Sequence, residues 1–386
     1  MKQEPPFCPN TFCSFHHPSK SNIAYRSEQK KWYIRKGWRP LVNGQRIQRY
    51  QCKNCNRIFS DRTFSIDYWE KRHLDYKKLL MMLVSCMSLR SLSRIFICSL
   101  KTIDNKLNRL TRQAIAAHSL LKDQLDLQEN LTADGFESFT VSQYFPNNFN
   151  LLVGKNSQFV YNFNYSQLRR KGRMTEAQRS RSEKLKKEVP IASGEIINRF
   201  AELIDEALRL QRRSSNKHQL KIYTDEREEY ASILSRSKFG LRSKSQGFRV
   251  FHHRTNSREP RNRSNPLFSV NYIDREIRKD LAEHVRESTR FGKNVNSAVC
   301  RMELYLFYHN YIKPFRINRR LRVYNTHAEA AGIQNKKIKK IMHMWIKRRF
   351  FLSHTELDLH SQKVWFRAYS TPGKWFTDVL PNYVFA

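Results

Sequence analysis

Four cysteines in the first 55 residues, arranged as two close pairs, constrain the fold of the N-terminal part of the chain more than any other feature. The pairs are Cys8-Pro-Asn-Thr-Phe-Cys13 and Cys52-Lys-Asn-Cys55. Tetrahedral zinc needs four soft or borderline ligands, and short cysteine pairs at the tips of two hairpins supply them, so a small unit can fold with little hydrophobic core. We therefore predict a zinc ribbon over residues 1–68, with Zn²⁺ in a structural role.

Two alternatives to this ligand set stay open. The four-residue spacer of the first pair is unusual, and His16 and His17 lie close enough to replace Cys13 as a ligand. The other alternative is four unrelated reduced thiols.

The sequence contains no apolar signal segment and no apolar run long enough to span a membrane. We therefore expect a protein of the reducing cytoplasm that is associated with the nucleoid and does not contact membrane.

The second constraint is an excess of positive charge. The chain carries 72 Lys and Arg against 34 Asp and Glu, a formal net charge of +38, and its basic clusters recur from Arg169 to Arg349. With 39% hydrophobic residues, the chain is too apolar to be a disordered basic tail. We expect a nucleic acid as partner, bound in a strongly salt-dependent way. A ribosome-associated or structural nucleic-acid binder is the alternative.

Residues 69–120 have the pattern of a helix-turn-helix domain that binds DNA. Ser88 and Ser99 suit the N-caps of two successive helices, and apolar residues recur at three and four. The predicted small core consists of Leu92, Phe96, Ile103 and Leu107. The residues expected to contact DNA are Lys101, Thr102, Asn105, Lys106 and Arg109. A helical hairpin that links two domains is the alternative.

The segment that follows changes to strands with acidic residues at or near their ends. Strands are expected at 130–137, 150–153, 158–161 and 219–224, helices at 194–212 and within 273–311, in the order βββαβα. Asp134 lies in the first strand and Asp225 directly follows the last. Carboxylates that converge at one edge of a sheet are hard oxygen ligands, suited to one or two Mg²⁺ or Mn²⁺ ions that support phosphodiester chemistry. Each acid alone could equally be a turn or cap residue.

Taken together, these features resemble the DDE transposases of bacterial insertion sequences, in particular those with an N-terminal zinc ribbon and a helix-turn-helix. The resemblance covers nearly the whole chain. Its carriers are the segments Cys52-Lys-Asn-Cys55-Asn-Arg-Ile-Phe59-Ser60, Ala133-Asp134-Gly135-Phe136-Glu137, Tyr223-Thr224-Asp225-Glu226 and Arg286-Glu-Ser-Thr-Arg-Phe291-Gly-Lys293.

The resemblance implies an α/β, RNase H-like mixed-sheet catalytic domain over residues 121–316, followed by a basic C-terminal extension over 317–386. It implies that Asp134 and Asp225 are the first two catalytic acids and metal ligands. The third is Asp274, which would also bind magnesium, or Glu287, while Glu276 lies close to the expected place.

The implied activity is binding of the terminal inverted repeats of a mobile element, followed by metal-dependent strand cleavage and strand transfer. Double-stranded DNA, as element ends and as target, would be the partner, and a homo-oligomer would form on it. The competing hypotheses are a DNA-binding regulator without activity and a nuclease of the same fold.

Overall fold

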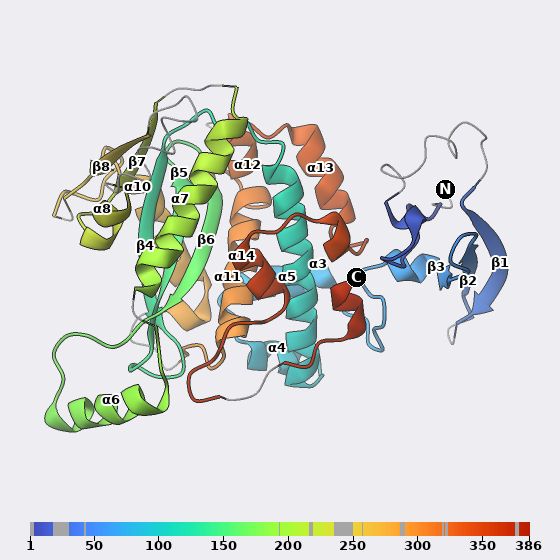
Figure 1. The fold of residues 1–386 in the computed structure, drawn as a ribbon, viewed down its shortest axis with the longest axis horizontal. Helices are drawn as coiled ribbons and strands as arrows, with labels where there is room; N and C mark the ends of the chain where they lie inside the picture. The colour runs from blue at the N-terminus through green and yellow to red at the C-terminus, as the bar shows by residue number, and fades with distance from the viewer. Residues whose placement is uncertain are drawn as a thin grey trace.

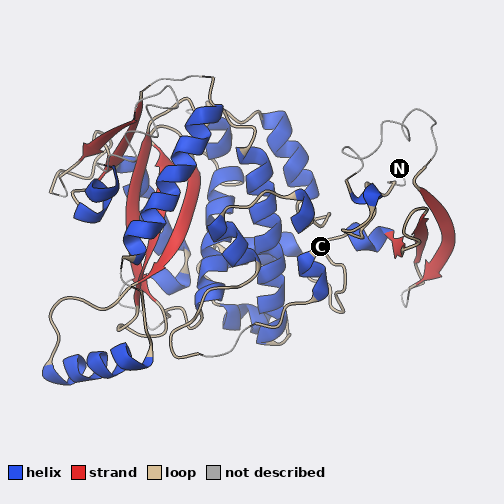
Figure 2. Cartoon of the chain, in the orientation of Figure 1, coloured by secondary structure: helices blue, strands red, loops and turns tan. Residues whose placement is uncertain are grey.

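A computed structural model describes residues 4–17, 31–41, 44–192, 194–215, 219–234, 250–256, 258–285, 290–318, 320, 323–374 and 378–386. Within these ranges the chain has a mixed α/β architecture. A small unit containing the N-terminus lies beside a larger body, in which helices cover a sheet (Figures 1 and 2).

The N-terminal unit contains a three-stranded antiparallel sheet in the order β1-β2-β3. Its elements are the 3-10 turns η1 (Ser14–His16) and η2 (Asp61–Phe64) and the strands β1 (Tyr33–Pro40), β2 (Arg46–Cys52) and β3 (Ile58–Ser60). Its own core is small and rich in aromatic residues and cysteines. This composition agrees with a unit that relies on a metal rather than on apolar burial.

Three helices follow: α3 (Tyr76–Leu83), α4 (Leu89–Ile95) and α5 (Leu100–Lys122). Ser88 and Ser99 cap α4 and α5 as predicted, since each side chain accepts a hydrogen bond from a backbone N–H three residues later. The predicted small core is confirmed. Leu92, Ile103 and Leu107 are fully buried, and Phe96 is partly buried against them.

The larger sheet has five strands in the order β6-β5-β4-β7-β8. Its strands are β4 (Leu131–Phe139), β5 (Pro146–Gly154), β6 (Val160–Gln167), β7 (Leu220–Thr224) and β8 (Val250–Arg254). The first three pair antiparallel, whereas β7 is parallel to β4 and β8 is parallel to β7. The predicted order of three strands, a helix, a strand and a helix is present, but β8 was not predicted.

Helices cover both faces of this sheet (Figure 1). The helix α7 (Glu195–Arg213) packs on β5 and β6, and α10 (Phe268–Asp280) packs on β4 and β5 from the other side. Between β7 and β8 lies the short α8 (Glu228–Leu234). The polar helix α6 (Glu176–Glu188) projects away from the body and buries none of its residues.

The C-terminal part of the chain packs against α5. After η3 (Ala282–His284) it contains α11 (Val295–Tyr311), α12 (His327–Ala330), α13 (Asn335–Met344), η5 (Leu352–His354), α14 (Leu359–Trp365) and η6 (Asn382–Phe385). The helices α11, α13 and α14 all contact α5. One continuous hydrophobic core runs from Ile66 to Val364, so the predicted boundaries at 120 and 316 both fall within it.

Candidate functional site

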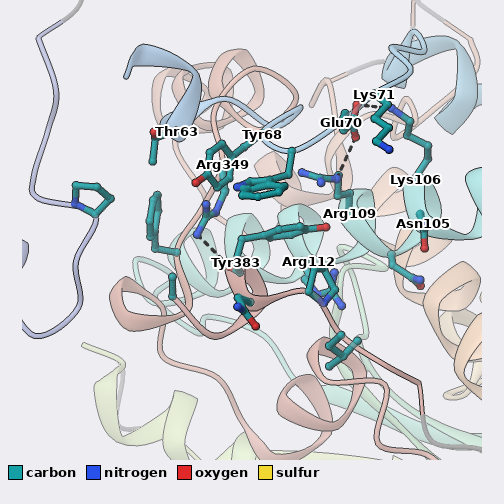
Figure 3. A pocket seen from close by; sticks show the side chains of 18 of the residues that line it. Thr63, Tyr68, Glu70, Lys71, Asn105, Lys106, Arg109, Arg112, Arg349 and Tyr383 are labelled. Carbon is teal, nitrogen blue, oxygen red and sulfur yellow. Dashed lines mark hydrogen bonds and ion pairs between the residues drawn. The ribbon is translucent and has the colours of Figure 1, made fainter. Parts of the chain in front are cut away.

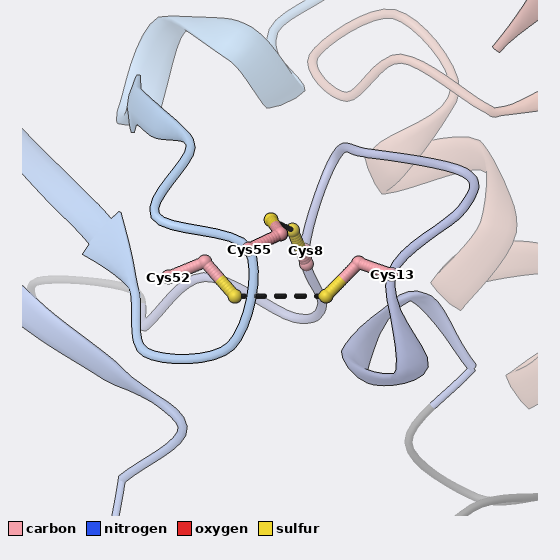
Figure 4. A group of neighbouring side chains, drawn as sticks. All are labelled: Cys8, Cys13, Cys52 and Cys55. Atoms are coloured by element: carbon pink, nitrogen blue, oxygen red, sulfur yellow. Dashed lines mark hydrogen bonds between the residues drawn. The ribbon is translucent and has the colours of Figure 1, made fainter.

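The four predicted zinc ligands come together in the N-terminal unit. The Sγ atoms of Cys8 and Cys55 lie 3.6 Å apart and those of Cys13 and Cys52 lie 3.7 Å apart (Figure 4). All four sulfur atoms lie within 4.8 Å of one another. Tetrahedral zinc with bonds of about 2.3 Å requires sulfur–sulfur distances of roughly 3.8 Å. The cluster could therefore hold a structural zinc ion.

The surroundings of the cluster favour Cys13 over His16 as the fourth ligand. The Nδ1 of His16 lies 2.6 Å from the carbonyl oxygen of Cys8, and its Nε2 lies 2.6 Å from Oγ of Ser353. Both ring nitrogens are therefore used in hydrogen bonds. Asn54 donates from Nδ2 to the Cys13 sulfur at 3.5 Å, a contact of the kind that orients a metal ligand.

The predicted carboxylates Asp134 and Asp225 lie side by side. Strands β4 and β7 pair in parallel with Thr132 opposite Tyr223, so the same register continued by two residues places Asp134 opposite Asp225. Residues opposite each other on parallel strands point to the same face of the sheet. The backbone N–H of Arg227 donates to Oδ1 of Asp225 at 3.0 Å, which orients this carboxylate just beyond the end of its strand.

The environment of Asp134 disfavours ionisation of its carboxyl group next to the charged Asp225. Burial raises the pKa of its carboxyl, the neighbouring charge of Asp225 raises it further, and the net result is a pKa of about 7. The backbone N–H of Gly135 donates to Oδ1 of Asp134 at 2.7 Å and lowers the pKa only in part. Two adjacent carboxylates of this kind form a site that a divalent cation would stabilise.

Of the candidates for a third acid, Asp274 lies on the helix that covers this face. Arg278, one turn after Asp274 in α10, places its guanidinium 4.4 Å from the ring centre of Phe136. Because Phe136 is two residues from Asp134 in the same strand, both side chains point toward α10. Asp274 therefore lies on the helix that packs on the face to which Asp134 points. Glu287 lies outside the described residues.

Glu276 has a different environment from Asp274. It is buried and forms ion pairs with Lys279, at 2.8 Å, and with Lys313. These contacts tie α10 to the segment that follows α11.

On the opposite face, a polar ladder that was not predicted from the sequence supports the strand that carries Asp134. Asn150 accepts from Asn148 at 2.5 Å and donates to Asn164 at 2.9 Å, and all three amides are buried. A Cβ atom at Gly135 would lie 2.2 Å from the Asn148 side chain, so the ladder requires glycine there. The alternation of asparagines in β5 and β6 was the available signal.

The residues predicted to contact DNA divide into two groups. Lys101 and Asn105 are exposed, and Thr102 is partly exposed. Lys106 and Arg109 are buried, and both form ion pairs with Glu70, Arg109 at 3.0 Å. This arrangement leaves Lys101, Thr102 and Asn105 as the accessible part of the predicted set.

All five of these residues line a cleft of about 870 Å³ between the N-terminal unit, the start of α5 and the C-terminal segment. Figure 3 labels three of them, Asn105, Lys106 and Arg109. Its basic lining residues are Arg57, Lys71, Arg72, Lys101, Lys106, Arg109, Arg112, Arg349 and Arg367. Glu70 and Asp378 are the only acidic lining residues among those described. The cleft also contains Tyr68, Trp69 and Tyr383, so it combines positive charge with aromatic rings.

No family model matches the chain, and none of the curated proteins compared with it is significantly similar in sequence. Among the described helices, none is long and apolar enough to cross a membrane.

Proposed function

We propose that the chain is a transposase of the DDE type, which binds the ends of a mobile element and catalyses cleavage and transfer of DNA strands. The observation that carries this proposal is the placement of Asp134 in β4 and of Asp225 directly after β7, the parallel neighbour of β4 in a mixed sheet. The strand order β6-β5-β4-β7-β8 supports an RNase H-like assignment, because one acid lies on its central strand and the other directly follows the parallel neighbour of that strand.

In this proposal Asp134, Asp225 and Asp274 hold one or two Mg²⁺ or Mn²⁺ ions. Bound there, these ions would supply Lewis acidity toward a phosphodiester. The carboxylate of Asp225 is oriented by the Arg227 backbone, and Asp134 is fixed by its own strand and by the backbone N–H of Gly135. The chain therefore contributes a rigid pair of oxygen ligands, which do not need to reorganise when a cation arrives.

The positive charge supports a DNA partner. The exposed Lys101 and Asn105 lie at the start of α5, and the basic cleft continues from them toward the C-terminal segment. Basic side chains such as these contact the phosphate backbone of DNA and position it without recognising the base sequence.

A cleavage and strand-transfer assay tests the proposal. A labelled duplex carrying the element's own end sequence is incubated with Mg²⁺ or Mn²⁺ and the wild type or the variants Asp134→Asn, Asp225→Asn, Asp274→Asn and Glu287→Gln. Glu226→Gln is the matched control, because Glu226 is an exposed acid directly after Asp225. We expect Asp134→Asn and Asp225→Asn to abolish both steps and Glu226→Gln to retain them.

Binding of Mn²⁺, measured by titration without DNA, gives a readout that does not depend on activity. We expect the two aspartate variants to lose this binding. A wild type that binds Mn²⁺ and the duplex but never cuts it would favour the regulator, and one that cuts but never joins ends would favour the nuclease.

A further inference from the structure

Trp69 is exposed in the basic cleft and has an unusual backbone conformation. Its side chain is 76% exposed, and its φ angle is +63°, in the left-handed region that residues with a side chain rarely adopt. A large apolar ring gains nothing for folding when it stays in water, and a left-handed backbone costs free energy at any residue except glycine. Neither feature is explained by the stability of the chain.

Hydrogen bonds on both sides hold this conformation in place. The N–H of Tyr68 donates to the carbonyl oxygen of Ser65 at 3.1 Å, and the N–H of Glu70 donates to that of Asp67 at 3.0 Å. The carboxylate of Glu70 is buried against Arg109 and Lys106. Backbone strain of this kind occurs at ligand clamps. Because other residues of the chain, such as Ile97, also have a positive φ, the surroundings of Trp69 have to identify the ligand.

The surroundings of Trp69 indicate the charge and shape of the ligand. Arg57, Lys71 and Lys101 line the same cleft and are exposed, so they can contact phosphates. The ring of Tyr68 lies nearly perpendicular to that of Trp69, with the centroids 6.1 Å apart. Exposed aromatic rings within a basic groove are the arrangement with which proteins stack unpaired bases.

From this geometry we infer that the cleft binds an unpaired nucleotide, with its base stacked on Trp69 and the flanking phosphates against Arg57, Lys71 and Lys101. This inference deepens the proposed function, since it assigns a second DNA site away from the acid pair. The ligand is either a base displaced from a duplex or part of a single strand. A fully paired duplex offers no base face to the ring.

Fluorescence anisotropy with three labelled probes tests this site: an oligothymidylate, a duplex with one bulged thymidine and the same duplex fully paired. The variant Trp69→Gly removes the ring and also relieves the backbone strain. The control is Trp38→Ala, which removes a tryptophan of 47% exposure from β1. We expect Trp69→Gly to bind the oligothymidylate and the bulged duplex roughly 10- to 100-fold more weakly, with unchanged binding of the paired duplex.

Thermal unfolding separates this role from a structural one. Because glycine adopts positive φ freely, we expect Trp69→Gly to melt at the same temperature as the wild type or higher. Unchanged affinity for the unpaired probes would overturn the inference, as would weaker binding that accompanies a lower melting temperature. A change of oligomeric state without a change of affinity would also overturn it, by showing that the ring contacts another protein copy.

Failure of this inference is distinguishable from failure of the proposed function. If the cleavage assay is negative while the unpaired probes bind through Trp69, the nucleotide site in the cleft is supported and the transposase proposal is wrong. If cleavage and strand transfer occur and Trp69→Gly binds every probe like the wild type, the transposase proposal is supported and the nucleotide site in the cleft is wrong.

Discussion

Lys122, in the last turn of α5, forms an ion pair of 2.7 Å with Glu206 of α7, and both side chains are more than nine-tenths buried. The pair joins the long helix that begins at the basic cleft to the helix that covers one face of the larger sheet. A buried charge that loses its partner is costly, because water cannot replace the lost contact.

We predict that Lys122→Met lowers the free energy of unfolding by about 2 kcal/mol, as measured by urea denaturation. This is less than the cost of a wholly unpaired buried charge, because Glu206 keeps its ion pair of 2.6 Å with Arg209. The matched control is Lys184→Met in α6, where Lys184 is exposed and lies 4.0 Å from Glu188. That exposed pair should contribute less than about 0.5 kcal/mol. Equal effects of the two substitutions would contradict the assignment of Lys122 to the core.

Glu303 of α11 gives the unfolding free energy a specific pH dependence. Its burial, together with the charge of Asp358, raises the pKa of this carboxyl to about 8. Between about pH 4.5 and 8 the folded chain keeps a proton that the unfolded chain has released, so stability falls as pH rises through this window.

We expect Glu303→Gln, which cannot ionise, to be more stable than the wild type at pH 9 by on the order of 3 kcal/mol. The gain should shrink toward zero at pH 5. Denaturant titrations at the two pH values measure the difference, and Glu188→Gln on the exposed α6 serves as control. A gain that is the same at both pH values would show that Glu303 is not protonated in the folded chain.

Zinc removal is expected to affect the N-terminal unit alone. Cys52→Ala removes one of four ligands, so we predict loss of bound zinc in elemental analysis and rapid proteolysis within residues 1–68. The larger body should keep its melting transition, because its hydrophobic core contains none of the four cysteines. Cys98→Ala, outside the cluster, should leave one zinc ion per chain. Retention of zinc by Cys52→Ala would rule out this ligand set.

Gly135→Ala is predicted to destabilise the strand that carries Asp134 by about 1–3 kcal/mol, because the new Cβ would lie 2.2 Å from the Asn148 side chain. Thermal or urea unfolding measures the loss. The control is Gly292→Ala, where the nearest atom is Ala298 Cβ at 3.4 Å. In the double variant with Asn148→Ala the cost should fall, and strictly additive effects would exclude the clash.

The sequence predicted those parts of the fold that depend on local patterns. The caps Ser88 and Ser99 and the strand ending before Asp225 are fixed by nearest neighbours, so they could be identified in advance. The helix α6 was missed because it has no apolar face, and β8 was missed because it is short and fully buries none of its residues.

The arrangement of side chains depends on contacts between distant segments, which no local pattern encodes. Glu70 lies 36 residues before Lys106, yet its carboxylate forms ion pairs with both buried side chains, Lys106 and Arg109. The side-by-side placement of Asp134 and Asp225 likewise follows from the parallel pairing of β4 and β7, which are separated by two strands and two helices. The third acid could not be chosen from spacing alone.

The unbroken length of α5 has a geometric consequence. At a rise of about 1.5 Å per residue, its 23 residues span roughly 35 Å. Its first turn borders the basic cleft, and its last turn is fixed to the helix over the sheet by Lys122. Because every residue from Lys106 to Ala117 is buried, the helix runs through the core, and its length fixes the separation between the basic cleft and the helix over the sheet.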